Sequence, residues 1–277
     1  MNKKLLALYG LKWNPFSPEL PIEALCATSR VENFCWRVEQ GLIREGGFAL
    51  ITGDPGSGKS VVLWMLAERL GQLRGLSVGA IAHPSGNLAD FYREMGDLFS
   101  VESRPHNRWG GFKALRERWL VHLEGTLLRP VLLIDEAQEM QPGVLSELHL
   151  LSSHQFDSRN LLSVVFAGDG CLNTKLRQDE LLPLGSRIRT RPIMEYASRD
   201  ELADCLYHLL TSAGNAHLMT PELATTLCDH AVGNYRVLTG MAGELLATAA
   251  QRELTQLDEK LFLHLYGTTP SKSRKIA

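Results

Sequence analysis

The sequence lacks the features of exported, membrane-spanning and generally basic proteins. No stretch comes near the roughly 20 consecutive apolar residues that cross a bilayer, so we expect no membrane contact. The first apolar run is short, and Lys12 and Trp13 follow it, which argues against a signal peptide. The five cysteines include no C-x-x-C pair, a pattern typical of reduced thiols in a cytoplasmic protein. The formal net charge is −2, so any contact with nucleic acid has to come from a local patch.

Internal repeats and low-complexity tracts are also missing, and the composition is that of a globular protein. Hydrophobic residues make up 44% of a chain of 277 residues, enough for one large or two modest domains. The predicted elements favour an α/β domain over residues 1–198, a helical domain over 199–267 and a basic, disordered tail over 268–277. Within the first domain, residues 1–28 contain several prolines and predict an extended N-terminal arm.

One stretch matches the phosphate-binding pattern G-x-x-x-x-G-K-[ST] at every fixed position. Its residues are Gly53, Asp54, Pro55, Gly56, Ser57, Gly58, Lys59 and Ser60. The apolar run over 48–52 predicts a buried strand before it, and residues 61–70 predict a helix after it. Glycines there let backbone N–H groups surround an anion, and the helix N-terminus adds positive charge. We expect Lys59 to reach the β- and γ-phosphates and Ser60 to bind Mg²⁺; the alternative is a chance glycine-rich turn.

A second apolar run, over 131–134, ends in two adjacent carboxylates, Asp135 and Glu136. At the tip of a buried strand, Asp135 is in place to hold Mg²⁺ through water. Glu136 is then in place to orient and deprotonate an attacking water. An acidic cap on the strand is the alternative, and the complete phosphate loop upstream favours the functional interpretation.

Two further stretches carry polar side chains that could reach a triphosphate. The run over 161–168 predicts a buried strand that ends at Asp169, which could sense the γ-phosphate or form an ordinary turn. Farther on come three arginines at alternate positions, which on a strand would all point to one side: Arg187, Arg189 and Arg191. One of them could reach the phosphate of a neighbouring subunit, or all three could form a solvated face.

The residues after 198 predict helices only. Ser198 and Glu201 have the spacing of a capping box, and Thr220-Pro221 is typical of a helix start. A third helix is predicted to begin at the stretch Gly233-Asn234-Tyr235-Arg236.

Together these motifs resemble those of AAA+ ATPases, and the resemblance covers nearly the whole chain. It rests on the phosphate loop, the acidic pair, the strand ending at Asp169, the element over 184–187 and the stretch over 233–236. It implies an α/β fold of five parallel strands flanked by helices, with nucleotide at their carboxyl ends and a small C-terminal helical lid. It also implies that ATP, bound with Mg²⁺ between the subunits of an oligomer, is hydrolysed to ADP and phosphate.

The same resemblance assigns two arginines. Arg187 matches the finger arginine that acts across a subunit boundary, although Arg189 and Arg191 are near enough to replace it. Arg236 matches the sensor arginine of the lid. Asp169 departs from the Asn, Thr or Gln often found at the sensor position, and the γ-phosphate would repel its carboxylate.

Within this class, residues 9–16 and 134–138 resemble the ExeA/TniB group. That group contains helper ATPases of DDE transposases, of the TniB, IstB and TnsC types, and secretion-pathway ATPases of the ExeA type. The secretion ATPases usually continue into a membrane span and a cell-wall-binding region, which the sequence to Ala277 lacks. We therefore expect a transposition helper, with an ExeA-like secretion ATPase and a slowly hydrolysing nucleotide switch as alternatives.

The helper ATPases assemble as rings or helical homo-oligomers on duplex DNA, select target DNA and recruit or activate the transposase. Their DNA contacts would be nonspecific, salt-sensitive contacts with phosphates. Residues 100–130 hold six basic and three acidic side chains. The DNA-binding candidates from that stretch are Arg104, Arg108, Lys113 and Arg116. Solvated helix charges are the alternative.

Overall fold

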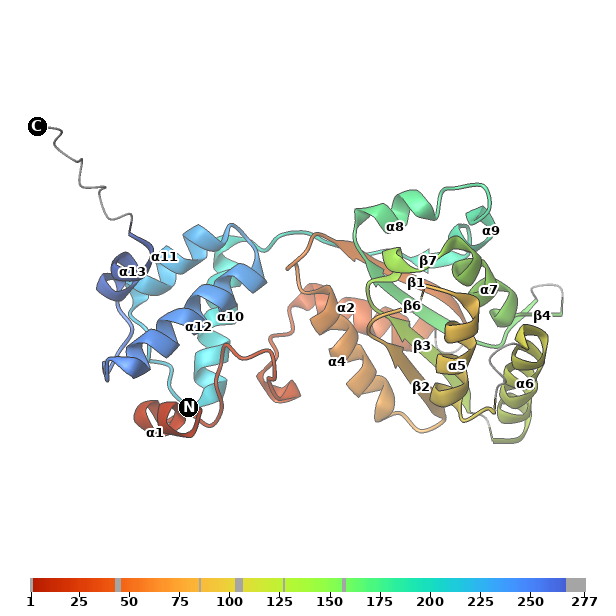
Figure 1. Cartoon of the computed structure of the whole chain (residues 1–277), viewed down its shortest axis with the longest axis horizontal. Coiled ribbons are helices and arrows are strands. Elements are labelled where there is room, and N and C mark those ends of the chain that lie inside the picture. The colour runs from red at the N-terminus through yellow and green to blue at the C-terminus, as the bar shows by residue number, and fades with distance from the viewer. Residues whose placement is uncertain are drawn as a thin grey trace, which may run out of the picture. The chain divides into compact units, whose positions relative to one another are not determined.

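The computed structural model describes residues 2–42, 46–84, 86–102, 107–126, 128–155 and 158–267. The chain folds as two compact units, a helical unit of residues 1–26 with 196–277 and an α/β unit of residues 27–195 (Figure 1). Each unit is described by itself below. The tail predicted over 268–277 lies outside the described residues.

The α/β unit is built on a parallel sheet of six strands. Along the sheet the strand order is β2-β3-β6-β1-β7, and β8 also pairs with β1. Their bounds are β1 Gly47–Gly53, β2 Leu76–Ile81, β3 Arg129–Ile134, β6 Ser163–Gly168, β7 Ile188–Thr190 and β8 Ile193–Met194. The sixth strand, β8, was not expected; it pairs with Thr52 and Gly53 at the end of β1, beyond the residues that pair with β7. Apart from this sheet, β4 (Ser153–His154) pairs antiparallel with β5 (Arg159–Asn160).

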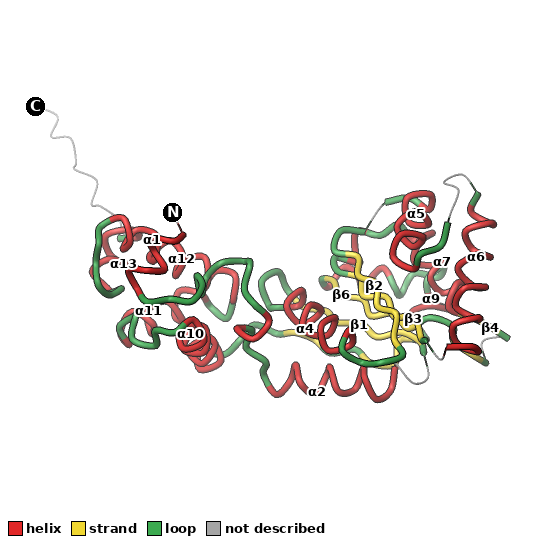
Figure 2. The backbone as a smooth tube through the Cα atoms, turned by 90° about the horizontal axis from the view of Figure 1, so that it is seen from below, coloured by secondary structure: helices red, strands yellow, loops and turns green. Residues whose placement is uncertain are grey.

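Helices cover both faces of the parallel sheet, because alternate residues of each strand point to opposite sides. Phe48 and Leu50 of β1 pack with the helices of one face, and Ala49 and Ile51 pack with those of the other. The first face carries α5 (Leu88–Phe99), α6 (Arg108–Val121), α7 (Pro142–Ser152), α8 (Gly170–Lys175) and α9 (Leu182–Gly185), and the second carries α2 (Ser29–Arg37) and α4 (Lys59–Gly71). Figure 2 shows α2 on the opposite side of the sheet from α5 and α6, and Figure 1 shows α8. Burial on both faces explains why the strand segments are apolar without alternation.

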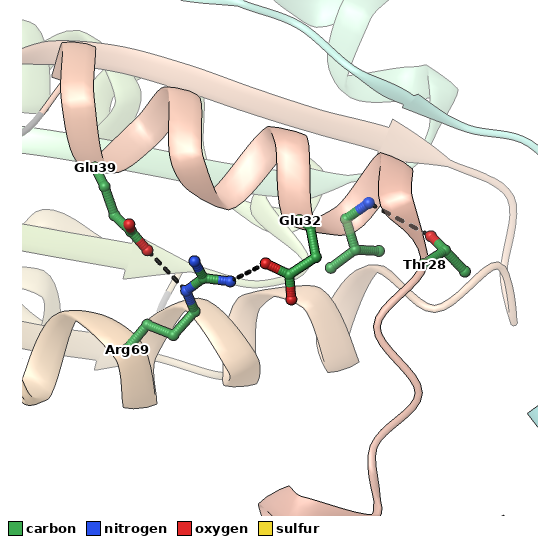
Figure 3. A network of polar contacts seen from close by, with 5 residues as sticks. Thr28, Glu32, Glu39 and Arg69 are labelled. Atoms are coloured by element: carbon green, nitrogen blue, oxygen red, sulfur yellow. Dashed lines mark hydrogen bonds and ion pairs between the residues drawn. The ribbon is translucent and has the colours of Figure 1, made fainter. Parts of the chain in front are cut away.

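On the second face, Arg69 ties α4 to the helix that precedes the sheet (Figure 3). Its guanidinium donates to Glu32 Oε2 of α2 at 2.5 Å and to Glu39 Oε1 at 2.8 Å. Glu39 belongs to η2 (Val38–Leu42), a π-helical turn that continues α2. Thr28 caps α2 by accepting from the backbone N–H of Val31 at 3.4 Å. These contacts hold α2 and η2 against α4.

Helix α6 begins at Arg108, within the basic stretch. Asn107 caps it by accepting from Gly110 N at 2.8 Å. Gly111 on this helix is needed for packing, because an added Cβ would lie 2.9 Å from Cδ1 of Tyr92 on α5. As a result, Trp109 lies on the first turn of a helix.

The helical unit contains α1 (Asn2–Tyr9), η1 (Ile22–Ala24), α10 (Arg199–Ala213), α11 (Pro221–Ala231), α12 (Tyr235–Gln251) and α13 (Glu259–Tyr266). The predicted capping box of Ser198 and Glu201 is present. The prediction of an extended arm is wrong for residues 2–9, which form a helix. The prolines that suggested an extended arm all come after this helix ends, so they do not interrupt it. The N-terminal segment also packs in this unit rather than in the α/β unit. Its residues Leu5, Tyr9, Leu11 and Phe16 share one core with α10–α13.

No helix among the described residues is long and apolar enough to span a membrane. The five cysteines are free thiols.

Candidate nucleotide-binding site

The phosphate loop connects the end of β1 to the start of α4, as the motif predicted. Gly56 and Gly58 have φ values of 84° and 96°, a left-handed conformation that side chains other than glycine rarely adopt. Gly53 has no room for a side chain, because an added Cβ would lie 2.3 Å from Met194 O and 2.8 Å from Ser57 Oγ. The glycines therefore let the loop turn tightly between β8 and the helix N-terminus.

Lys59, the first residue of α4, spans the loop. Lys59 is only 7% exposed, and its Nζ donates to Gly53 O at 2.8 Å and to Asp54 O at 3.0 Å. Ser57 Oγ is buried without a hydrogen-bond partner among the described residues. A cradle of glycine backbone, a helix N-terminus, an ammonium group and an unpartnered hydroxyl fits a phosphate chain. Ser60 follows on the exposed side of the same helical turn.

The acidic pair lies at the carboxyl end of β3, the same edge of the parallel sheet as the phosphate loop. Asp135 Oδ1 accepts from Glu136 N at 2.9 Å, which orients the Asp135 carboxylate. Glu136 has a φ of 48°, a left-handed conformation that costs roughly 1–2 kcal/mol for an L-residue. Strain of this kind gathers at functional sites, where the surrounding structure holds the residue in place. Carboxylate and hydroxyl oxygens, as in Asp135 and Ser60, suit Mg²⁺.

Gln138 holds the Glu136 side chain, and sequence reasoning gave it no role. Its Nε2 donates to Glu136 Oε2 at 2.6 Å, and its Oε1 accepts from Asp169 N at 3.3 Å. The amide thus bridges the end of β3 to the residue that follows β6. Gly168 has to be small for this contact, because an added Cβ would lie 2.7 Å from Gln138 Oε1. The sequence signal that could have indicated this contact is the position of Gln138, two residues after Glu136.

Asp169 follows β6 as predicted, and its carboxylate caps a helix. Its Oδ1 accepts from Cys171 N at 2.8 Å at the start of α8. This is the turn geometry that the sequence left open as the alternative. A neutral side chain that sequence reasoning missed lies on the same helix: Asn173 Nδ2 donates to Thr52 Oγ1 of β1 at 3.3 Å.

The three arginines near β7 do not share one strand face, so that expectation is wrong. Only Arg189 lies within β7, because the strand spans three residues. Arg187 precedes it, and its Nη1 donates to Pro183 O at 2.6 Å. Arg191 follows it and donates to Ile188 O at 3.4 Å and to Gly185 O. The Arg189 residue, in the middle of β7, is exposed.

Arg236 lies in the helical unit, in the first turn of α12. Asn234 caps that helix by accepting from Arg236 N at 3.0 Å and Val237 N at 3.1 Å. Gly233, with a φ of 81°, precedes the cap. The Arg236 side chain is exposed. A cation at a helix N-terminus opposes the helix dipole, so local helix stability does not account for arginine there.

The basic stretch gave four DNA-binding candidates, of which Arg104 lies outside the described residues. Arg108 is bound to a carboxylate: its Nε and Nη2 donate to Glu147 Oε1 at 2.9 Å and Oε2 at 2.5 Å. Arg116 caps the end of α7, where its Nη1 donates to Leu150 O, Leu151 O and Ser153 O. Burial there lowers the pKa of the Arg116 guanidinium. Lys113 is exposed, with its Nζ 5.2 Å from the ring centroid of Trp109.

The sequence and the fold match known proteins. Residues 43–176 match the profile of a family described as an AAA domain. Over 248 residues the chain is 30% identical to the general secretion pathway protein A of Aeromonas hydrophila, a match that covers 88% of this chain and 44% of that protein. The chain therefore spans less than half the length of this relative.

Similar folds occur among solved structures at low identity. Cdc6p from Pyrobaculum aerophilum matches with a TM-score of 0.72 and 18% identity over 88% of this chain and 67% of that one. Drosophila ORC bound to DNA matches with a TM-score of 0.67 and 14% identity over 94% and 64%. The Thermotoga maritima RuvB Holliday junction branch migration motor matches with a TM-score of 0.58 and 14% identity over 91% and 72%.

Proposed function

We propose that this chain, which has the α/β P-loop AAA+ fold expected from its sequence, hydrolyses ATP to ADP and phosphate with Mg²⁺. One observation carries the proposal: a buried lysine ammonium lies across a glycine loop at the sheet edge that also carries Glu136. This is the arrangement needed to hold a phosphate chain beside a general base.

Each residue has a proposed role in that reaction. The backbone N–H groups of the glycine loop bind phosphate oxygens, and Lys59 exchanges its two carbonyl partners for them. Ser60 and Asp135 hold Mg²⁺, which neutralises charge on the phosphate chain when bound. Glu136 takes the proton of the attacking water. Gln138 keeps the Glu136 carboxylate in one orientation.

Two arginines complete the proposal. Arg187 is the finger that reaches a neighbouring subunit's nucleotide, with Arg189 and Arg191 as the other candidates. Arg236 is the sensor arginine, supported by its exposed position in the first turn of α12, where the helix dipole disfavours a cation. To act as a γ-phosphate sensor, Asp169 would have to release the cap that its carboxylate gives α8.

The test is ATP hydrolysis by the purified chain, with and without Mg²⁺, for wild type and Glu136→Gln. Glu136→Gln is isosteric and removes only the base, so we expect turnover to fall about a hundredfold while ATP still binds. A variant that hydrolyses ATP as fast as wild type excludes Glu136 as the base. A wild type that binds ATP but hydrolyses it no faster than the protein-free control supports the slowly hydrolysing switch instead.

For the cellular role, we propose an ATPase that oligomerises in the cytoplasm on duplex DNA and recruits or activates a DDE transposase. The likeness of residues 9–16 and 134–138 to the ExeA/TniB group supports it. The expected result is a fast-sedimenting assembly that forms only with both ATP and duplex DNA and dissociates at high salt. A chain that sediments identically with and without DNA contradicts this role.

A second candidate role is an ATPase of a secretion pathway. The 30% identity to the Aeromonas hydrophila secretion protein favours it. In that case, ATP-dependent assembly would be independent of DNA, and the protein would co-purify with membranes from the native cells. The same sedimentation series, run with and without duplex DNA, separates the two roles.

A further inference from the structure

A pocket of about 300 Å³ lies between α6 and α7, on residues that the nucleotide site does not use. We call it the α6–α7 pocket. Its lining residues are Arg108, Trp109, Phe112 and Arg116 of α6, Glu147 and Leu150 of α7, and Ser153. Its volume suits one large side chain of a partner.

The rim of the pocket is an exposed aromatic pair. Trp109 is 63% exposed and stacks on Phe112, with ring centroids 5.5 Å apart and planes within 7°. Leu150, across the pocket on α7, is 45% exposed. Exposed tryptophan beside a hollow is typical of the anchor positions of protein–protein interfaces, where aromatic side chains contribute most of the binding free energy.

The floor of the pocket is held by hydrogen bonds, and the carboxylate in it is paired with a guanidinium. Glu147 has a side chain 2% exposed, and it is held by the fork of Arg108 and by Tyr92 OH at 2.5 Å. Burial and the neighbouring Glu147 raise the pKa of Tyr92, so its hydroxyl stays protonated and donates. A wall whose hydrogen bonds already exist in the free protein loses little entropy when a partner binds.

The outward charge around the pocket is positive. Lys113 is exposed beside Trp109, and Arg116 lies with its guanidinium carbon 5.2 Å from the Phe112 ring centroid. On α6, apart from Arg108 that is paired with Glu147, three cations outnumber the single acid, Glu117; they are Lys113, Arg116 and Arg118. With Glu147 neutralised inside, the field at the pocket mouth attracts an anionic partner.

We infer that the α6–α7 pocket binds an acidic protein segment that inserts an aromatic side chain beside Trp109. The inserted ring would pack against Trp109 and Leu150, and flanking carboxylates would meet Lys113. A protein segment fits better than nucleic acid because Arg108 and Arg116 already donate to Glu147 and to backbone carbonyls. A phosphate would have to take Arg108 from a buried carboxylate. The inference goes beyond ATP hydrolysis and does not depend on it.

The test is selection of random peptides displayed on phage against the full chain, followed by fluorescence anisotropy of the enriched peptides. We expect enriched sequences to pair Asp or Glu with Trp, Phe or Tyr. Trp109→Ala should weaken their binding about tenfold or more, since it removes the central anchor. Lys113→Glu should weaken it as well, more at low salt than at high salt.

Trp36→Ala is the matched control, because Trp36 is also an exposed tryptophan of the α/β unit, 58% exposed on α2. It should leave peptide affinity within about twofold of wild type, as expected for a distant site. Melting curves and binding of a fluorescent ATP analogue should be the same for all variants. These readouts separate failure of the pocket from failure of the nucleotide site.

Three results overturn the inference. One is a selection that enriches no sequence or enriches basic ones. Another is enriched peptides that bind Trp109→Ala as tightly as wild type. The last is a labelled DNA duplex that loses affinity on Trp109→Ala and Lys113→Glu while the acidic peptides do not, which would assign the pocket to nucleic acid.

Discussion

The carboxyl edge of the sheet and the α6–α7 face both carry charged side chains, but these charges are held in different ways. At the sheet edge, Lys59 donates to loop carbonyls, which a phosphate chain can replace. On the α6–α7 face, Arg108 is bound by a buried carboxylate and Arg116 by the end of a helix. The difference teaches that a cation is available for a ligand only when its present partners are weak acceptors. Lys59 meets that condition and Arg108 does not. Arg116 also donates to carbonyls, but it is held by three of them at once at the end of α7.

The largest effect should come from Lys59→Ala. Loss of the charged hydrogen bonds to the phosphates should weaken ATP binding about a hundredfold or more, about 3 kcal/mol. Fluorescent ATP-analogue titration measures it. Lys113→Ala, an exposed lysine of the same unit, is the control and should bind nucleotide like wild type. If Lys59→Ala and wild type bound the ATP analogue with equal affinity, Lys59 would not be more available for a ligand than the arginines of the α6–α7 face.

Arg108→Ala should mainly destabilise the fold, because it leaves the buried Glu147 carboxylate with Tyr92 as its remaining hydrogen-bond donor among the contacts described above. We expect a loss of about 2 kcal/mol in the free energy of unfolding by urea, less than a fully buried pair would lose because the Arg108 side chain is 60% exposed. Arg118→Ala on the same helix should stay within about 0.5 kcal/mol. Unchanged stability together with lost DNA binding would return Arg108 to the DNA-binding candidates.

Gln138→Leu keeps the size of the side chain and removes its hydrogen bonds to Glu136 and Asp169. We expect kcat to fall about tenfold, with the affinity for ATP within about twofold of wild type. In a Glu136→Gln background the same substitution should add no further loss, since Gln138 acts through Glu136. Losses that add in the double variant would mean that Gln138 only supports the fold.

The smallest effects should come from substitutions at Asp169. They test whether the Asp169 carboxylate takes part in ATP hydrolysis at the sheet edge. Asparagine caps helices as well as aspartate, so Asp169→Asn should keep both hydrolysis and melting temperature. Asp169→Ala should lose about 1 kcal/mol of stability. Slow hydrolysis in an Asp169→Asn protein of normal stability would restore the sensor role.

Motifs that are local in sequence were predictable, and contacts across the fold were not. The phosphate loop and the acidic pair each lie within a few residues at a strand end, so their spacing was sufficient to place them. Gln138 was missed because it contacts the end of another strand. The partner of Arg108, Glu147, is 39 residues away, so counting basic residues could not reveal it.

The N-terminal helix was missed for a similar reason. Prolines after residue 10 predicted an extended arm, and the apolar side chains that stabilise α1 pack against helices from the other end of the chain. Strand β8 is two residues long, too short for any periodicity to signal it.

The union of residues 1–26 with the helices after 196 has a consequence for synthesis. The first segment leaves the ribosome long before its partner helices are translated, whereas residues 27–195 can complete their own core in the meantime. Leu5, Tyr9, Leu11 and Phe16 therefore stay uncovered on every nascent chain until α10–α13 emerge. Nascent chains stalled inside the second half should bind chaperones through this leading segment.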